Sequence, residues 1–305
     1  MAVIRTVLGS ISPSELGVTY GHEHLITCPP EFVLKLDSDL ELNNVDKAIQ
    51  ELGYFAMAGG RSLVECTTID YGRNIELINT IAHKSPVHII LVTGFQKSKY
   101  LAPYVDGKSI NEIADWMVKE LLEGIENTSI KPNLIKVGSS LNMITEDEKK
   151  VMIAASRAHL ETGSPITTHT EAGTMGFEQL EILVKEGVDP SRIMIGHLDR
   201  NLDWDYHKQL AARGCFLIFD HLSKEKYAPD KVRVEFILRL VKEGYGKQIL
   251  FSGDFGRKSY WPSYGGGPGF TFILWRFIPW LRFAGLCEQA IEDILINNPR
   301  QALQK

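Results

Sequence analysis

Residues 17 to 25 read GVTYGHEHL, an apolar, β-branched run that contains His22 and His24. Successive side chains of an extended strand point to opposite faces, so the two histidines would share one face, while Glu23 would point away toward a neighbouring strand or loop. Two imidazoles on one face can grip a metal ion, although H-x-H pairs also occur by chance on solvated strands. The segment predicts a first strand and part of a candidate metal site.

Seven further runs of this kind follow at fairly even spacing, each succeeded by a longer amphipathic stretch. They are RSLVECT from Arg61, HIILVTGF from His88, NLIKVG from Asn133, PITTHT from Pro165, RIMIGHLD from Arg192, CFLIFD from Cys215 and QILFSGD from Gln248. Strands that alternate with helices pair in parallel, and eight such units close most naturally into a (β/α)8 TIM barrel. We therefore expect an α/β fold with one domain over residues 1–305.

Local signals mark some of the connections. Ser109 with Glu112, and Thr145 with Glu148, have the spacing of a capping box at a helix start. The GGGPG cluster at residues 265–269 predicts a flexible loop after the eighth strand. Loops that follow barrel strands surround the active site, so this loop and the long segment at residues 28–44 are expected to form its walls.

The composition is that of an ordinary soluble globular protein. The chain is 44% hydrophobic and 23% charged, and its formal net charge of -5 gives no basic excess that would suggest a nucleic-acid partner. The four cysteines lie far apart without C-x-x-C spacing, which favours reduced thiols in a cytoplasmic protein over a disulfide framework or a zinc knuckle. The N-terminus lacks the pattern of a signal peptide, so export is not expected.

The most apolar segment runs from Phe270 to Cys287 and is interrupted by Arg276, Pro279 and Arg282. These interruptions argue against a membrane span. A buried or loop-covering helix with an aromatic face is the favoured interpretation, and a subunit contact or a membrane-surface role remains an alternative. A homodimer is expected because two-fold dimers are the commonest oligomers of soluble proteins.

Side chains with metal-binding chemistry stand at the ends of several predicted strands. The candidates are His22 and His24 from the first strand, His169 from the fifth, His197 from the sixth and Asp254 from the eighth. The C-terminal ends of barrel strands converge on one face, which gives these residues a common destination. Four imidazoles and a carboxylate exceed the needs of one zinc ion but suit two ions that share a bridging ligand. Each residue alone would more often be structural, so the prediction rests on their joint placement.

Lys136, in the run NLIKVG, is the candidate bridge. Burial in a barrel would lower the pKa of this lysine and expose a neutral amine. Such an amine can react with carbon dioxide to give an anionic carbamate, whose two oxygens could span two metal ions. An ordinary ion pair with a carboxylate inside the barrel is the alternative. Five other histidines are interpreted as structural or surface residues, namely His83, His88, His159, His207 and His221.

The motifs GVTYGHEHL, NLIKVG, PITTHT, IGHLD and SGD, in this order over nearly the whole chain, resemble the phosphotriesterase-related family of the amidohydrolase superfamily. The resemblance implies that one metal ion is held by His22, His24 and Asp254. It implies that the second ion is held by His169 and His197, and that a carboxylated Lys136 bridges the two. Some relatives have glutamate at the bridging position, so a lysine there favours the carboxylated form.

The resemblance also implies a mechanism. Two divalent ions acidify a shared water, so that a bridging hydroxide attacks a lactone or ester, while Asp254 shuttles the proton to the leaving group. Imidazole and carboxylate ligands favour zinc first and also accept manganese, cobalt or iron.

The substrate should be decided by the loops after the third, seventh and eighth strands. Lys224 follows the seventh strand, and Arg257 and Tyr260 follow the eighth, which together would suit a phosphate monoester. This D-x-x-R-K-S-Y pattern resembles the branch that hydrolyses phosphorylated sugar γ-lactones. A solvated basic loop is the alternative interpretation. Lys97 and Lys99, after the third strand, could add charge.

Two other functions stay open from the sequence. The first is a hydrophobic, acyl-homoserine lactonase with promiscuous phosphotriesterase activity, which usually has a tyrosine where this chain has Gln96. The second is a non-catalytic barrel that binds a small molecule and uses its metals structurally. Asp70 could serve as a loop cap or as a substrate contact.

Overall fold

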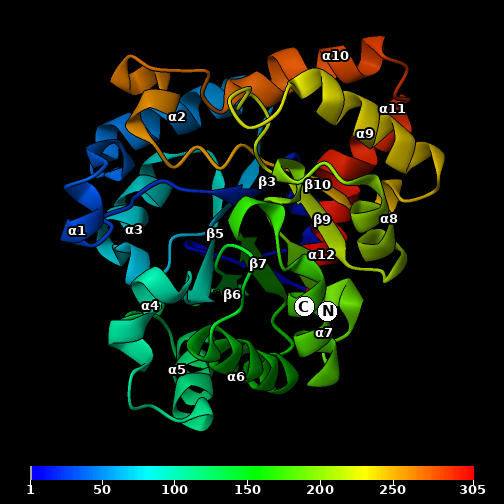
Figure 1. The fold of residues 1–305 in the computed structure, drawn as a ribbon. Helices are drawn as coiled ribbons and strands as arrows, with labels where there is room; N and C mark the ends of the chain where they lie inside the picture. The colour runs from blue at the N-terminus through cyan, green and yellow to red at the C-terminus, as the bar shows by residue number, and fades with distance from the viewer. Residues whose placement is uncertain (1) are drawn as a thin grey trace.

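Eight parallel strands form the centre of the computed structural model, which describes residues 2–305 (Figure 1). The strands are β3 (Thr19–Glu23), β4 (Ser62–Glu65), β5 (His88–Gly94), β6 (Leu134–Ser139), β7 (Ile166–Thr170), β8 (Ile193–Ile195), β9 (Phe216–Phe219) and β10 (Ile249–Phe251). Each strand pairs in parallel with the next in chain order. All eight predicted strands and the (β/α)8 barrel class are confirmed.

Helices surround the barrel in Figure 1. They are α1 (Glu31–Leu34), α2 (Val45–Met57), α3 (Ile75–Lys84), α4 (Ser98–Val105), α5 (Ile110–Leu122), α6 (Glu146–Thr162), α7 (Gly176–Lys185), α8 (Trp204–Ala212), α9 (Asp230–Lys242), α10 (Ile278–Phe283), α11 (Glu288–Glu292) and α12 (Asn298–Leu303). Both predicted capping boxes are present, because the Ser109 and Thr145 side chains accept from the backbone N–H of Glu112 and Glu148, whose carboxylates return the contact.

The barrel closes where β3 meets β10. The backbone N–H of His22 donates to Ser252 Oγ (3.0 Å), and the Ser252 hydroxyl donates to the carbonyl of His22 (2.6 Å). The Glu23 carboxylate, fully buried, lies 2.7 Å from Ser252 Oγ and accepts from Gly253 N and Phe255 N at 2.6 Å and 2.9 Å. The prediction that Glu23 holds a neighbouring strand or loop is confirmed, because its partners lie in the loop directly after β10, and this seam brings His22 close to Asp254.

Alternation along the strands divides the apolar residues between two cores. Val64, Ile90 and Leu250 belong to a cluster built from one face of six strands, which fills the barrel interior. Their neighbours, such as Leu63 and Ile89, belong to the larger cluster shared with the helices. Because the barrel interior is packed, polar side chains on the strands can reach solvent only at the strand ends.

An N-terminal hairpin was not predicted from the sequence. Strands β1 (Ile4–Thr6) and β2 (Gly9–Ile11) pair antiparallel. Ile4 packs into the interior cluster together with Leu303 of α12, so the two chain ends cover the barrel floor side by side (Figure 1). The face with the C-terminal strand ends is left for the functional site.

The aromatic segment after β10 is helical, as expected. It passes through a π-helical turn at Ile273–Phe277 into α10 and buries Phe270 and Phe277. On its outer side Trp275 and Phe283 are 54% and 91% exposed. Within residues 2–305, none of the helices has both the length and the apolar character needed to cross a bilayer. The homodimer stays a prediction.

Hydrogen bonds tie two of the predicted loops to their surroundings. The GGGPG turn folds back on its own loop, since Gly266 N donates to Trp261 O and Gly269 N donates to Tyr260 O. The segment after β3 lies over the strand ends, where Asp39 accepts from the backbone and hydroxyl of Ser259. Leu40 of the segment after β3 lines the pocket over the strand ends, whereas none of residues 265–269 does, so the GGGPG turn does not form the wall that was expected of it. The four cysteines are unpaired, as predicted.

The close packing around Gly138 in β6 can be tested by adding a methyl group there. A Cβ at Gly138 would lie 1.9 Å from the carbonyl oxygen of Gln96 and 3.2 Å from His169 Cβ. We expect Gly138→Ala to lower the free energy of unfolding by about 1–3 kcal/mol, because overpacking displaces backbone. Urea denaturation measures the change.

Gly53→Ala is the matched control, because a Cβ at this position in α2 would have no neighbour within 4 Å. Alanine there should be neutral or should stabilise the protein by roughly 0.5–1 kcal/mol through helix propensity. Equal destabilisation by both variants would show that the close approach at Gly138 is not what limits its size.

Candidate metal centre and active site

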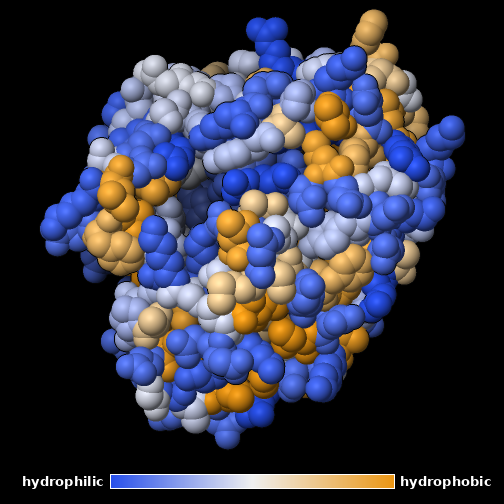
Figure 2. All heavy atoms as spheres, in the orientation of Figure 1, coloured by the Kyte–Doolittle hydropathy of each residue, from blue (hydrophilic) through white to orange (hydrophobic). Residues whose placement is uncertain are grey.

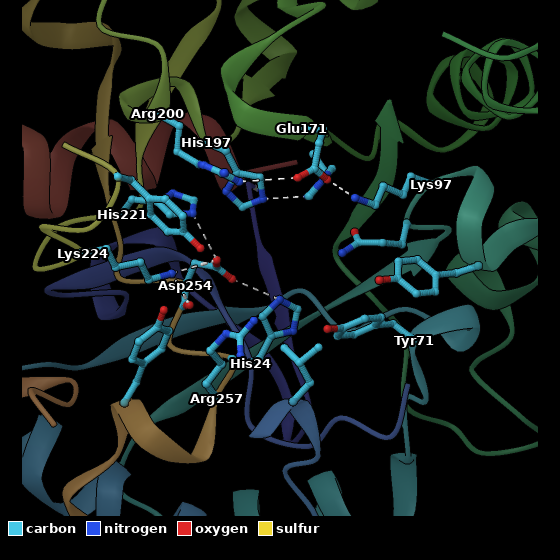
Figure 3. Close-up of a pocket in the computed structure, with 17 residues that line it drawn as sticks. His24, Tyr71, Lys97, Glu171, His197, Arg200, His221, Lys224, Asp254 and Arg257 are labelled. Atoms are coloured by element: carbon cyan, nitrogen blue, oxygen red, sulfur yellow. Dashed lines mark hydrogen bonds and ion pairs between the residues drawn. The ribbon is translucent and has the colours of Figure 1, made fainter. Parts of the chain in front are cut away.

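A pocket opens over the C-terminal ends of the strands, and Figure 2 shows it as a hollow with a mainly hydrophilic surround. Side chains from β3, β7 and β8 and from most of the loops beyond the strands converge on it (Figure 3). The charged and aromatic lining residues are His24, Tyr71, Lys97, Tyr100, His169, Glu171, His197, Arg200, His221, Lys224, Tyr227, Asp254, Arg257 and Tyr260.

The predicted ligands from the two ends of the chain lie together. His22, His24 and Asp254 each offer an atom within 4.8 Å of the others, and all three come from the seam between β3 and β10. His24 Nε2 lies 3.4 Å from Asp254 Oδ1, while His24 Nδ1 lies 2.7 Å from Thr67 Oγ1. Asp254 itself has a φ of 45°, a left-handed conformation that few non-glycine residues adopt. A strained residue at this position is typical of a functional site.

His169 and His197 face each other through ring nitrogens, with His169 Nδ1 2.8 Å from His197 Nε2. The opposite nitrogens approach carboxylates: His197 Nδ1 lies 2.9 Å from Asp220 Oδ1, and His169 Nε2 lies 3.2 Å from Glu171 Oε2. An ionised carboxylate only accepts, so those nitrogens carry the protons and the two facing nitrogens present lone pairs. Two lone pairs that face each other repel, whereas a cation bound between the two nitrogens would accept both.

Lys136 is fully buried, and its Nζ lies 3.0 Å from His22 Nε2. Within residues 2–305 it takes part in no ion pair with a carboxylate, so the alternative of an ordinary barrel ion pair is not found. Lys136 adds to the lowering of the pKa of both His22 and His169. Its amine is therefore close to both halves of the cluster.

Burial keeps His22, His169 and His197 neutral, which is the form that binds metal. Burial, and secondarily the Lys136 charge, lowers the pKa of His22 to about 3. Burial, assisted by His197, lowers the pKa of His169 well below its ordinary value, and burial also lowers the pKa of His197. The donor set thus consists of neutral imidazoles and a carboxylate, the chemistry that zinc and similar divalent ions accept.

Asp220 is a functional candidate that sequence reasoning missed. It is fully buried at the end of β9, and its Oδ1 lies 2.9 Å from both His197 Nδ1 and His221 Nδ1. Its Oδ2 lies 3.1 Å from His22 Nδ1. One carboxylate therefore orients histidines from three different strands or loops. The available signal was its position at a strand end, which it shares with Asp254.

His221 belongs to the pocket, which corrects its interpretation as a structural or surface residue. Only 3% of it is exposed, and its Nε2 lies 3.7 Å from Asp254 Oδ2. Asp199 accepts from the backbone N–H of His221 at 2.9 Å. By contrast, His207 is buried against carbonyls of the β8 loop and fits the structural interpretation. Asp70 is a loop cap, because it accepts from Gln96 N and Thr68 Oγ1.

The three predicted substrate contacts all line the pocket, on the side formed by the loops after β9 and β10 (Figure 3). Lys224 Nζ donates to the carbonyl of Asp254 (2.7 Å) and to its Oδ2 (3.0 Å), and lies 5.0 Å from the Tyr260 ring centroid. Arg257 Nη1 donates to Asp37 Oδ2 at 2.6 Å. The guanidinium is thus anchored by the segment after β3, and the two cations of the group each pair with a carboxylate.

A second wall faces this group, and sequence reasoning identified only one of its members, Lys97. It consists of Lys97, Glu171 and Arg200, from the loops after β5, β7 and β8. Glu171 pairs with Lys97 and lies 3.5 Å from Arg200 Nη1. The guanidinium of Arg200 also lies 4.2 Å above the Tyr227 ring. Both long walls of the pocket are therefore charged, which disfavours an apolar substrate channel.

The sequence and the structure both resemble known proteins. Residues 2–303 match the model of the Phosphotriesterase family. The chain is 34% identical over 289 residues to the phosphotriesterase homology protein of Escherichia coli, covering 94% of this chain and 98% of that protein. It is 33% identical over 323 residues to the phospho-furanose lactonase of Mycoplasmopsis synoviae, covering 98% and 91%. A crystal structure of a lactonase from Listeria monocytogenes superposes with a TM-score of 0.95 at 37% identity, covering 99% and 98%.

Proposed function

Since the chain belongs to the phosphotriesterase family, we propose that it is a metal-dependent hydrolase that opens a phosphorylated sugar γ-lactone. The observation that carries the proposal is the cationic group of Lys224, Arg257 and Tyr260, which lies beside the strand-end histidine and aspartate cluster. The names of the Mycoplasmopsis and Listeria relatives support lactone hydrolysis.

The residues present fit a dinuclear metal centre. His22, His24 and Asp254 would hold one divalent ion, and His169 and His197 would hold the other. Lys136, as a carbamate, would bridge them, with zinc as the first candidate and manganese, cobalt or iron as alternatives. The facing lone pairs of His169 and His197, 2.8 Å apart, support this assignment. Bound divalent ions acidify water and polarise a carbonyl or phosphoryl oxygen.

Asp254 would take up the proton released by the attacking water and pass it on. Burial disfavours its charged form, but Lys224 and His24 hold the pKa of Asp254 well below its ordinary value, so the carboxylate is ionised. The lactone leaving group would then receive that proton from Asp254. His221, 3.7 Å from Asp254 Oδ2 and tied to Asp220, would steady the carboxylate during this exchange.

The phosphate would bind between Arg257, Lys224 and Tyr260. Arg257 is held by Asp37 and Asp39, so its guanidinium is already oriented before substrate arrives. Guanidinium and ammonium groups form the strong, charge-assisted hydrogen bonds that a phosphate dianion requires. The polar second wall would face the ring hydroxyls of the sugar. We further propose a cytoplasmic location, which the four free thiols support.

A pair of matched lactones, with and without the phosphate, tests this substrate class. We expect the wild type to prefer the phosphorylated lactone. Arg257→Met should lower kcat/KM for it by roughly tenfold to a hundredfold, the worth of a charged hydrogen bond. The unphosphorylated lactone should change by less than about threefold, since it makes no use of the guanidinium.

Lys258→Met is the control in the same loop, because Lys258 does not line the pocket and pairs with Glu41. It should leave both lactones unaffected. Equal rates on the two lactones, or no effect of Arg257→Met, would refute the phosphate site. A preference for acyl-homoserine lactones would instead favour the hydrophobic lactonase, and metal binding without any hydrolysis would favour a non-catalytic barrel.

A further inference from the structure

We propose that Glu171 is a positioning residue for the metal centre: its carboxylate fixes the proton of His169 and thereby directs His169 Nδ1 at the metal position. This role rests on the proposed dinuclear function. The contact is direct, since Glu171 Oε2 lies 3.2 Å from His169 Nε2. The other ring nitrogen of His169, Nδ1, faces His197 Nε2.

The backbone after β7 is shaped to bring Glu171 back over His169. Ala172 has a φ of 54° and Gly173 a φ of 75°, so two left-handed residues follow Glu171 directly. Thr174 closes the turn, because its backbone N–H and its hydroxyl both donate to the carbonyl of Glu171. Alanine adopts this conformation at a cost of order 1 kcal/mol, which the surrounding structure must offset. The turn is thus imposed on the chain and returns the carboxylate to the pocket.

Gly173 has no room for a side chain, which keeps this turn in place. A Cβ there would lie 2.7 Å from Asn201 Cβ and 3.1 Å from the carbonyl oxygen of His197. The turn after β7 therefore packs against the loop that carries His197. Both histidines of the proposed second ion are positioned by one packed pair of loops.

Two cations keep Glu171 in the state that this role requires. Lys97 pairs with its Oε2, and Arg200 Nη1 lies 3.5 Å from its Oε1. An ammonium and a guanidinium hold this carboxylate beside His169, where it serves as a hydrogen-bond acceptor because a carboxylate cannot donate. His169 must then carry its proton on Nε2, and its Nδ1 is left as a lone pair for a metal ion. Figure 3 shows these contacts meeting at Glu171.

Metal affinity, measured by chelator competition on the full chain, tests the proposal without reliance on activity. Glu171→Gln keeps the size of the side chain but can donate to His169 Nε2 and so no longer fixes the proton. We expect it to bind the more weakly held of two zinc ions about tenfold to a hundredfold less tightly than the wild type, the usual effect of losing such a partner. The other ion should be retained.

Glu181→Gln is the matched control, because it makes the same exchange at an exposed position of α7 that does not line the pocket. It should bind both zinc ions at least as tightly as the wild type. Histidine ring-nitrogen NMR of the zinc-loaded wild type should show His169 protonated at Nε2, which keeps the proposal testable if Glu171→Gln folds poorly.

Unchanged zinc affinity in Glu171→Gln, equal weakening in Glu181→Gln, or a His169 protonated at Nδ1 would overturn the role of Glu171 while leaving a dinuclear hydrolase in place. A wild-type protein that holds no divalent ion would overturn the proposed function and this role with it. The outcomes for the two proposals are therefore distinguishable.

Discussion

Replacing Asp254 with asparagine should lower kcat/KM for lactone opening by about a thousandfold, because proton transfer by a positioned carboxylate contributes on this scale. Asparagine keeps the shape and one oxygen but cannot accept a proton. It also leaves the Lys224 ammonium, which lies 3.0 Å from Asp254 Oδ2, without its charged partner. Steady-state kinetics on a phosphorylated lactone, with metal content measured on the same samples, checks the prediction.

Asp203→Asn is the control for this experiment. Asp203 caps α8 by accepting from the backbone N–H of Tyr206, and asparagine caps a helix about as well. Its kinetics should match those of the wild type. If Asp254→Asn kept both ions and more than about a tenth of the wild-type kcat/KM, a general acid–base role for Asp254 would be untenable.

Lys136→Met should remove most of the bound metal, from about two ions per chain to well below one, because the bridge between the two positions is lost. Lactone hydrolysis should fall with it by at least about a hundredfold. The buried amine lies 3.0 Å from His22 Nε2, so methionine would fill the space without offering an oxygen. Metal analysis reads the first effect. Intact mass under mild conditions, compared with the wild type, should show the loss of one carbon dioxide.

Lys136→Glu tests whether a carboxylate at this position is enough to hold metal without a lysine. Glutamate brings a carboxylate to the same strand position, so it should retain clearly more metal than methionine does. If Lys136→Met still bound two ions, or if metal loading of the wild type were indifferent to added bicarbonate, the carbamate bridge would be wrong.

The strands could be predicted because their signal is local. Each of the eight runs is a continuous apolar segment bounded by turn residues, and a parallel barrel buries such strands on both faces. The hairpin of β1 and β2 was missed because three residues per strand are too few to show a period. The Glu112 and Glu148 capping boxes were correctly predicted for the same reason that makes strands readable, since all partners lie within four residues.

The candidate site was only partly predictable. The proximity of His22, His169 and Asp254 could be predicted from the sequence, because barrel topology fixes where strand ends meet. The role of Asp220 could not, because it depends on which rings from other strands face its two oxygens. The pairing of Arg257 with Asp37 joins loops at opposite ends of the chain, and no sequence pattern specifies that contact. Such contacts arise from packing, which the order of residues does not show.

Because the proposed metal would bind at the seam between β3 and β10, it would also stabilise the closed barrel. His22 lies on β3 and Asp254 follows β10, and hydrogen bonds of His22 and Glu23 join the two segments. An ion held from both sides would clamp the first strand to the last, so its binding energy would add to the stability of the folded chain in proportion to the logarithm of metal concentration. Chelation should therefore speed amide hydrogen exchange first along β3 and β10, so that the barrel begins to open where the two ends of the chain meet.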